Sequence, residues 1–162
     1  MHPLALLQLI VLLMLANTTP LAAKKVLGAR FAWPLDGGIA FFDGRPLLGA
    51  SKTVRGVVLS MLVTAAAAPL VGLDVKLGAL IAACAMAGDL FSSFVKRRLN
   101  LPPSSRATGL DQIPESLFPL LACRETLSLS AADIVAGVAI FFAGAVIFSR
   151  VLYRLRMRDQ PY

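Results

Sequence analysis

Long apolar runs separated by short polar segments dominate the chain. Residues 56–73 contain no charged side chain over eighteen positions, and residues 77–87 and 134–149 are also uncharged. A helix of about 20 apolar residues spans the hydrocarbon core of a bilayer. The pattern therefore predicts an all-α integral membrane protein that forms one domain over residues 1–162.

The same pattern predicts about five transmembrane helices. They cover approximately residues 4–22, 56–73, 76–95, 113–127 and 134–153. The fourth is the weakest, because Pro119, Arg124 and Glu125 interrupt it. The first segment has small residues at its end, as a signal peptide would. However, no Lys or Arg precedes it, and Lys24 and Lys25 follow it, which favours an uncleaved helix with its N-terminus outside.

The distribution of Lys and Arg predicts the topology. Residues 24–55 hold six of the sixteen cations, while residues 96–106 and 150–158 hold four each. Placing all three regions in the cytoplasm satisfies the positive-inside rule and requires residues 113–127 to cross the membrane. The N-terminus is then outside, the C-terminus is cytoplasmic, and the two cytoplasmic loops are residues 24–55 and 96–112.

Composition supports the membrane assignment and narrows the partners. The chain is 57% hydrophobic and only 15% charged, and its mean hydropathy is +0.76, which a soluble domain of this length does not sustain. The net charge of +7 lies in short loops, so it indicates membrane topology and anionic lipid or phosphate binding rather than nucleic acid. Cys84 and Cys123 lack metal-ligand spacing and are interpreted as packing residues.

Residues 88–98 carry the first candidate chemistry. Asp89 ends an uncharged run, and on a helix Asp89, Ser93, Lys96 and Arg97 share one face at i, i+4, i+7 and i+8. A carboxylate just inside a membrane helix is costly and usually marks an ion, proton or substrate site. This face is therefore predicted to hold an anionic group, and a metal, at the membrane edge.

The loop before residue 56 is rich in glycine and cations. Glycine allows the backbone to approach a phosphate closely, and Lys and Arg neutralise its charge. Gly44, Gly49, Lys52 and Thr53 suggest a P-loop, but the lysine comes two residues too late and no strand precedes the loop. A solvated connector with topology-determining charges is the alternative interpretation.

The second loop leads into the fourth predicted span. Pro114 suits a first helical turn, Glu115 there faces the positive end of the helix dipole, and Asp111 precedes the helix as a capping residue would. Alternatively, Asp89 and Asp111 flank one loop and converge at the membrane face. Two carboxylates with nearby cations can hold Mg²⁺ together with substrate phosphates.

Two blocks of this sequence resemble a known family. The first is Asp36-Gly37, Phe42-Asp43-Gly44-Arg45, Gly49, Lys52-Thr53 and Arg55-Gly56. The second is Gly88-Asp89-Leu90, Ser93, Lys96, Arg97 and Asp111-Gln112. In this order they resemble the CDP-archaeol synthases, and the second block more loosely resembles phosphatidate cytidylyltransferases. The resemblance covers roughly residues 30–120 and agrees with five spans.

The chain departs from that family at one position. Family members usually carry a second aspartate three residues after the first, and Pro114 stands there, followed by Glu115. Either Glu115 substitutes, or Asp89 and Asp111 hold the metal alone, or the chain is a divergent member with altered substrate or lost activity. The joint presence of the basic and acidic residues of both blocks argues against loss.

The resemblance implies a CTP-dependent cytidylyltransferase. CTP and a glycerol-phosphate lipid, an archaeal-type ether lipid or phosphatidic acid, would give CDP-lipid and pyrophosphate. The implied Mg²⁺ ligands are Asp89, Asp111 and, more weakly, Glu115. The catalytic residues are these two aspartates with Lys52 and Lys96. The substrate-binding residues are Thr53, Arg55, Ser93 and Arg97, with Gly44, Gly49 and Gly56 folding the loop over the nucleotide.

The residues alone leave open two alternative functions, each from another class of protein. One is a small transporter or channel subunit with Asp89 as an intramembrane ion site. It is disfavoured because polar residues concentrate at the cytoplasmic side. The other is a non-catalytic membrane protein whose basic loops bind anionic lipid.

Overall fold

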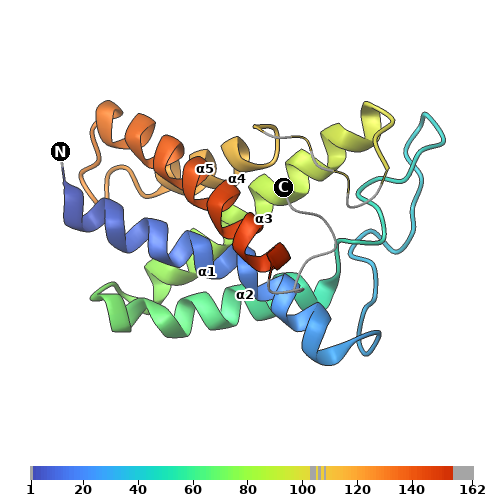
Figure 1. Cartoon of the computed structure of the whole chain (residues 1–162), viewed down its shortest axis with the longest axis horizontal. Helices are drawn as coiled ribbons and strands as arrows, with labels where there is room; N and C mark the ends of the chain where they lie inside the picture. The colour runs from blue at the N-terminus through green and yellow to red at the C-terminus, as the bar shows by residue number, and fades with distance from the viewer. Residues whose placement is uncertain (1, 103–104, 106, 108, 155–162) are drawn as a thin grey trace.

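The protein is a bundle of helices with long loops at one end (Figure 1). The computed structural model describes residues 2–102, 105, 107 and 109–154; Arg106, Arg156 and Arg158, counted above among the cytoplasmic cations, lie outside them. The helices are α1 (Pro3–Leu27), α2 (Val54–Ala67) with the 3₁₀ turn η1 (Ala68–Val71), α3 (Val75–Arg98), α4 (Gln112–Ala122) and α5 (Ala131–Arg154). The predicted all-α class is confirmed.

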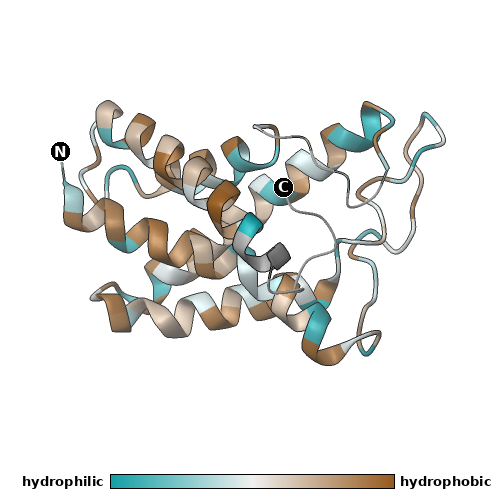
Figure 2. Cartoon of the chain, in the orientation of Figure 1, coloured by the Kyte–Doolittle hydropathy of each residue, from teal (hydrophilic) through white to brown (hydrophobic). Residues whose placement is uncertain are grey.

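Four helical segments are long and apolar enough to cross a membrane within the described residues. They are Pro3–Leu27, Val54–Val71, Val75–Arg98 and Ala131–Arg150. Their side chains are mostly apolar, whereas polar residues gather toward the end of α3 and in the turns (Figure 2). The protein is a multi-pass integral membrane protein.

The predicted fourth span is shorter than expected. Helix α4 has 11 residues, or about 16 Å, against a hydrocarbon core of about 30 Å. Pro119 lies inside it without ending it, and the prediction of a helix to residue 127 is wrong because the chain turns at Cys123 instead. The amides of Leu127 and Leu129 donate to the carbonyls of Cys123 and Arg124, so turns replace the missing helix.

Hydrogen bonds between distant segments show which helix ends lie together. The His2 amide donates to Asp133 Oδ1 over 3.2 Å, and the Gln8 side chain donates to the Val71 carbonyl over 2.7 Å. The starts of α1 and α5 therefore lie at the end where α2 turns into α3. Arg45 at the opposite end donates to the Arg98 carbonyl over 2.5 Å. Residues 112–130 thus carry the chain from the loop end back toward the first end.

Small residues allow the helices to pack closely around an apolar core. Helix α1 contributes several of its leucines to this core. The fully buried side chains include Leu9, Leu12, Leu13, Ile81, Leu120 and Phe141. A Cβ on Gly78 would lie 2.5 Å from the Ala68 Cβ, so α3 meets the end of α2 nearly backbone to backbone.

Candidate active site

A single buried carboxylate organises the loop before α2. Asp36 accepts hydrogen bonds from the amides of Gly38 at 3.0 Å, Leu48 at 2.9 Å and Gly49 at 3.0 Å. Burial acts to raise the pKa of Asp36, but the amides of Gly49, Leu48 and Gly38 favour the charged form and leave its pKa below the ordinary value. The ionised Asp36 therefore holds together two parts of the loop that are twelve residues apart.

Backbone pairing then places Lys52 at the start of α2. The Leu35 amide donates to the Lys52 carbonyl over 2.8 Å, and the Val54 amide donates to the Trp33 carbonyl over 3.1 Å. Thr53 is the N-cap of α2, since its hydroxyl oxygen accepts from the Gly56 amide at 3.2 Å. The predicted phosphate ligand Thr53 thus has a structural role that fixes the residue next to it.

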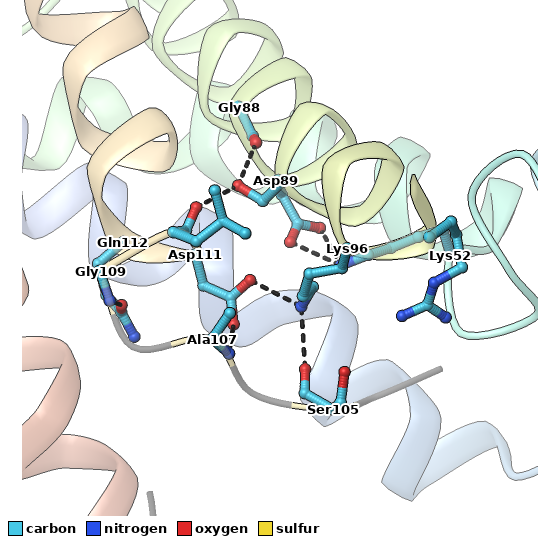
Figure 3. Close-up of polar contacts among 12 residues, drawn as sticks. Lys52, Gly88, Asp89, Lys96, Ser105, Ala107, Gly109, Asp111 and Gln112 are labelled. Carbon is cyan, nitrogen blue, oxygen red and sulfur yellow. Dashed lines mark hydrogen bonds and ion pairs between the residues drawn. The ribbon is translucent and has the colours of Figure 1, made fainter. Parts of the chain in front are cut away.

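Lys52 meets Asp89 in the first of two lysine–carboxylate pairs. Its Nζ lies 2.6 and 2.5 Å from the two carboxylate oxygens, and each side chain is 21% exposed (Figure 3). The pair joins the first loop to α3 across 37 positions of sequence. The predicted meeting of the first loop with the Asp89 face is present in the structure.

Lys96 and Asp111 form the second pair, at 2.7 Å (Figure 3). Lys96 also donates to the Ser105 carbonyl at 3.0 Å, and Asp111 Oδ2 accepts from the Ala107 amide at 3.3 Å. Asp111 makes no side-chain capping bond to α4 and has helical backbone angles. The capping interpretation of Asp111 is therefore wrong, and its carboxylate faces the charged face of α3.

Glu115 joins these carboxylates through a close approach of α3 and α4. Its side chain lies close to Asp89 and within electrostatic reach of Lys52 and Asp111. A Cβ on Gly88 would lie 2.5 Å from the Pro114 carbonyl carbon and 2.7 Å from the Glu115 nitrogen. Only a glycine at position 88 lets the two helices come this close, which puts Asp89 beside Glu115.

Ser92 is a member of the site that the sequence interpretation missed. Its side chain is fully buried, and its hydroxyl lies 2.9 Å from the Gly88 carbonyl and 2.8 Å from the Leu110 carbonyl. The second contact ties the residue before Asp111 to α3. The predicted Ser93 is also buried, at 3% exposure. Ser92 differs from Ser93 because its side chain faces the loop rather than the charged face of α3. Only the tertiary structure shows this difference.

Arg98 docks the tip of the first loop onto the end of α3, a role that the sequence interpretation also missed. Its guanidinium lies 3.0 Å from an Asp43 oxygen and 4.6 and 5.0 Å from the ring centres of Phe41 and Phe94. It also donates to the Pro46 carbonyl over 2.7 Å. Its partners in the loop are far away in sequence, so no local sequence pattern indicated this role.

The other predicted substrate residues lie outside the carboxylate cluster. Arg55 donates to the carbonyls of Gly28 and Arg30, which close the end of α1. Arg97 donates to the Pro102 carbonyl over 2.8 Å. Their substrate contacts stay predictions.

The predicted glycines serve the backbone in two different ways. Gly44 and Gly49 have positive φ, at 75° and 95°, so they supply turns that other residues rarely adopt. Gly56 has a different role, because a Cβ there would lie 3.2 Å from the Pro20 Cβ on α1. Their proposed folding over a nucleotide stays a prediction.

The donor chemistry of the cluster fits a hard divalent cation. Three carboxylates stand against two lysines, and Mg²⁺ is commonly held by one or two carboxylates together with substrate phosphates. Within the described ranges, no three His, Cys, Asp or Glu side chains form a ready ligand group. Asp89 and Asp111 are instead paired with lysines. These residues therefore fit a cation that substrate phosphates would help to hold, and not one held by protein ligands alone.

The comparisons with known proteins decide the family. Residues 3–162 match the CarS-like family, described as CDP-archaeol synthase. The chain belongs to this family. The CDP-archaeol synthase of Sulfurisphaera tokodaii is 33% identical over 135 residues, which cover 80% of this chain and 81% of that protein. The CDP-archaeol synthase of Pyrococcus furiosus is 39% identical over 107 residues, 60% of each chain.

A solved structure extends the likeness to the fold. It is described as an intramembrane enzyme for archaeal membrane lipid biosynthesis, and it is 31% identical to this chain. The two superpose with a TM-score of 0.73 over 86% of this chain and 89% of that one. The resemblance drawn from the two sequence blocks is confirmed, and the helices around the carboxylate cluster are those of a CDP-archaeol synthase fold.

Proposed function

We propose that the chain is a CTP-dependent cytidylyltransferase that converts a glycerol-phosphate lipid into a CDP-lipid and pyrophosphate. The observation that carries this proposal is the cluster of Asp89, Asp111 and Glu115 with Lys52 and Lys96 at the loop end of a membrane bundle. Membership of the CDP-archaeol synthases supports an archaeal-type ether lipid as the substrate. A non-catalytic scaffold needs no such set of paired charges.

The reaction requires the protein to bring two anionic substrates together. An oxygen of the lipid phosphate forms a bond to the α-phosphorus of CTP. The bond from that phosphorus to the oxygen that bridges to the β-phosphorus breaks, and its electron pair leaves with pyrophosphate. No covalent enzyme intermediate is needed, so catalysis rests on positioning and on charge stabilisation.

Lys52 and Lys96 are suited to that task. Each already sits against a carboxylate oxygen, and a phosphate oxygen can take the place of that carboxylate as the anionic partner. The lipid phosphate would approach from the bilayer side, where α3 and α4 pack, and its chains would stay among the helices. CTP would approach from the loops.

Mg²⁺ is proposed as the cofactor, with Asp89 and Asp111 as its protein ligands and Glu115 as a third. When bound, it would neutralise phosphate charge and help to orient the two substrates. Asp89 and Glu115 lie close together, so two carboxylates meet where their mutual repulsion would favour a bound cation.

We also propose that the loop end faces the cytoplasm, with the N-terminus outside. Fourteen of the sixteen cations of the sequence then lie in the predicted cytoplasmic regions. The triphosphate substrate is a cytoplasmic molecule, so this orientation places the lysines where CTP arrives.

Conversion of radiolabelled CTP into a lipid-soluble product tests the proposal. The purified chain is reconstituted with a dialkyl glycerol phosphate in one arm and a phosphatidic acid in the other, with Mg²⁺. Label should enter the lipid phase and pyrophosphate should be released, with the dialkyl substrate preferred. Absence of product in both arms, from protein that is folded by its melting profile, would refute the activity.

A further inference from the structure

A surface at the end of α1 combines apolar and basic side chains. The last turn of α1 and the residues that follow it form this area, which we call the α1-end surface. It consists of Val26, Phe31 and Trp33 with Lys24, Lys25 and Arg30. The end of α1 lies on the opposite flank of the loop end from the end of α3 (Figure 1). In the part of the chain that the structure describes, no hydrogen bond or ion pair links these side chains to the carboxylate cluster.

The apolar side chains of this surface are largely open. Val26 is 82% exposed, Phe31 62% and Trp33 68%. The rings of Phe31 and Trp33 pack edge to face with their centres 6.1 Å apart, so they form one apolar area. Large apolar side chains in water are unfavourable, whereas the amphipathic ring of Trp is favoured at the membrane–water interface.

The length of α1 places this surface at the edge of the bilayer. The helix has 25 residues, or about 37 Å, against a hydrocarbon core of about 30 Å. Its last turn, which carries Lys24 and Lys25, therefore extends beyond the core into the headgroup layer. The cations and the rings that follow them then lie where lipid phosphates lie.

The backbone of the surface is held in place while its side chains stay open. Arg55 at the start of α2 donates to the carbonyls of Gly28, over 3.1 Å, and Arg30. The Trp33 carbonyl accepts from an amide of α2 over 3.1 Å. Phe31 has a φ of 55°, in the left-handed region that a bulky residue rarely adopts. Such strain persists only where the surrounding structure enforces it and often marks a binding site.

The cations of the surface have no acidic partner among the described residues. Residues 1–35 contain no Asp or Glu. Asp36 follows, but it accepts hydrogen bonds from three amides of its own loop. The ion pairs of the described structure use other cations, namely Lys52, Lys96 and Arg98. Three unpaired positive charges beside exposed rings are complementary to an anion that is attached to an apolar body.

We propose that the α1-end surface binds the headgroups of anionic lipids in the bilayer around the protein. The rings lie at the level of the headgroups, and Lys24, Lys25 and Arg30 contact the lipid phosphates. A soluble phosphate would satisfy the cations but would leave the rings in water, so charge and apolar area together favour a lipid. The inference goes beyond the proposed function and is independent of it, because it involves neither CTP nor the carboxylates.

The fluorescence of Trp33 tests this surface directly, because Trp33 is the single tryptophan of the chain. The full-length chain is reconstituted without CTP into zwitterionic vesicles that contain a minor lipid brominated close to its headgroup. This quenching lipid is anionic in one arm and zwitterionic in the other, at equal mole fraction. The anionic lipid should quench Trp33 about twofold more strongly, because the cations enrich it beside the ring.

A triple variant and a control variant identify the groups responsible. Lys24→Gln/Lys25→Gln/Arg30→Gln should abolish the preference for the anionic lipid and keep the quenching by the zwitterionic one. Lys76→Gln/Arg124→Gln is the control and should keep the preference, since both side chains are exposed and follow helices that lead away from the loop end.

Equal quenching in both arms by the unchanged protein, or a preference that the triple variant retains, overturns the inference. Trp33 that no brominated lipid quenches would place the rings in water and overturns it as well. If the triple variant does not fold, the unchanged protein decides, because its preference for the anionic lipid should fall as salt screens the charges. A preference that is independent of salt contradicts the proposal. None of these outcomes bears on transferase activity, so the two proposals fail separately.

Discussion

The two lysine–carboxylate pairs of the site are built differently. Lys52 and Asp89 contact each other through three atoms, and no further hydrogen bond from either side chain to the loop backbone is recorded in the described structure. Lys96 and Asp111 are embedded, because they also bond to the backbone at Ser105 and Ala107. The first pair is thus held by its charge, and the second also shapes the loop that precedes α4. We therefore expect substrate exchange to perturb the first pair more easily than the second.

The largest predicted effect follows from removing one carboxylate charge at a time. Asp89→Asn should lower kcat about 10²–10³-fold, since a charge that positions the reacting groups is lost, while the melting temperature changes little. Asp111→Asn should lower both kcat and the melting temperature. Transfer assays at several Mg²⁺ concentrations, with thermal unfolding in detergent, measure the two quantities. Normal Mg²⁺-dependent pyrophosphate release by Asp111→Asn would remove Asp111 from the metal site.

Neutralising each lysine tests the same difference between the two lysine–carboxylate pairs. Lys96→Gln leaves Asp111 partly buried without its cation, so it should destabilise the protein by about 1–3 kcal/mol and reduce activity strongly. Lys52→Gln should reduce activity with a smaller loss of stability. Denaturant or thermal unfolding of both variants under identical conditions gives the comparison. Equal losses of stability would show that the two pairs are equivalent.

Glu115→Gln is expected to have an intermediate effect of about tenfold on activity, because two carboxylates remain to hold a cation. The Mg²⁺ concentration for half-maximal activity should rise in parallel. Gln keeps the size of the side chain and removes only its charge. Unchanged activity and Mg²⁺ dependence would reduce Glu115 to a residue of the first turn of α4.

Ser92 and Ser93 offer a matched pair with a smaller expected effect. Ser92→Ala removes the bond to the Leu110 carbonyl and should lower kcat a few-fold, with a net loss of about 1 kcal/mol in stability. Ser93→Ala serves as its neighbour on the same turn and tests the predicted phosphate contact. A raised KM for CTP in Ser93→Ala alone would assign substrate contact to Ser93 and leave Ser92 as a positioning residue.

The smallest predicted effect concerns how the stability of the first loop depends on pH. The pKa of Asp36 is lower in the folded protein than its ordinary value of 3.8, so the loop gains stability from it above that pH. This contribution is lost as the pH falls through the lower, folded value. The protection factors of the Leu48 and Gly49 amides, which correct for the intrinsic pH dependence of exchange, should stay high at pH 5 and fall in strong acid. In Asp36→Asn the pH dependence of these protection factors should disappear.

Hydropathy and charge predicted most of the fold, and the exceptions have physical causes. The four long helices follow from apolar runs that nothing interrupts. The short length of α4 was not predicted from hydropathy. Turns replace the rest of the expected helix, and their hydrogen bonds are made locally within residues 123–129. The convergence of Asp89 and Asp111 was predictable from the topology. Which lysine pairs with which aspartate was not, since this depends on how the Asp36 turn bends the first loop.

Side chains with two plausible uses were the hardest to assign. Arg55 looks like a phosphate ligand in sequence, but it donates to carbonyls at the end of α1. Arg98 looked like one more topology charge, although it stacks on Phe41 and Phe94. In both cases the partner is far away in sequence, so no local pattern identifies it.

Helix α3 continues for nine residues after Asp89, about 14 Å, before it ends at Arg98. Asp89, which is proposed to bind a cation, is therefore recessed below the rim where the arginines lie. Fewer water molecules reach such a depth, and the effective dielectric constant falls there. Each charge in the recess then acts on a phosphate more strongly than the same charge at the rim would. The length of one helix thus sets the strength of the electrostatic field in which the two substrates meet.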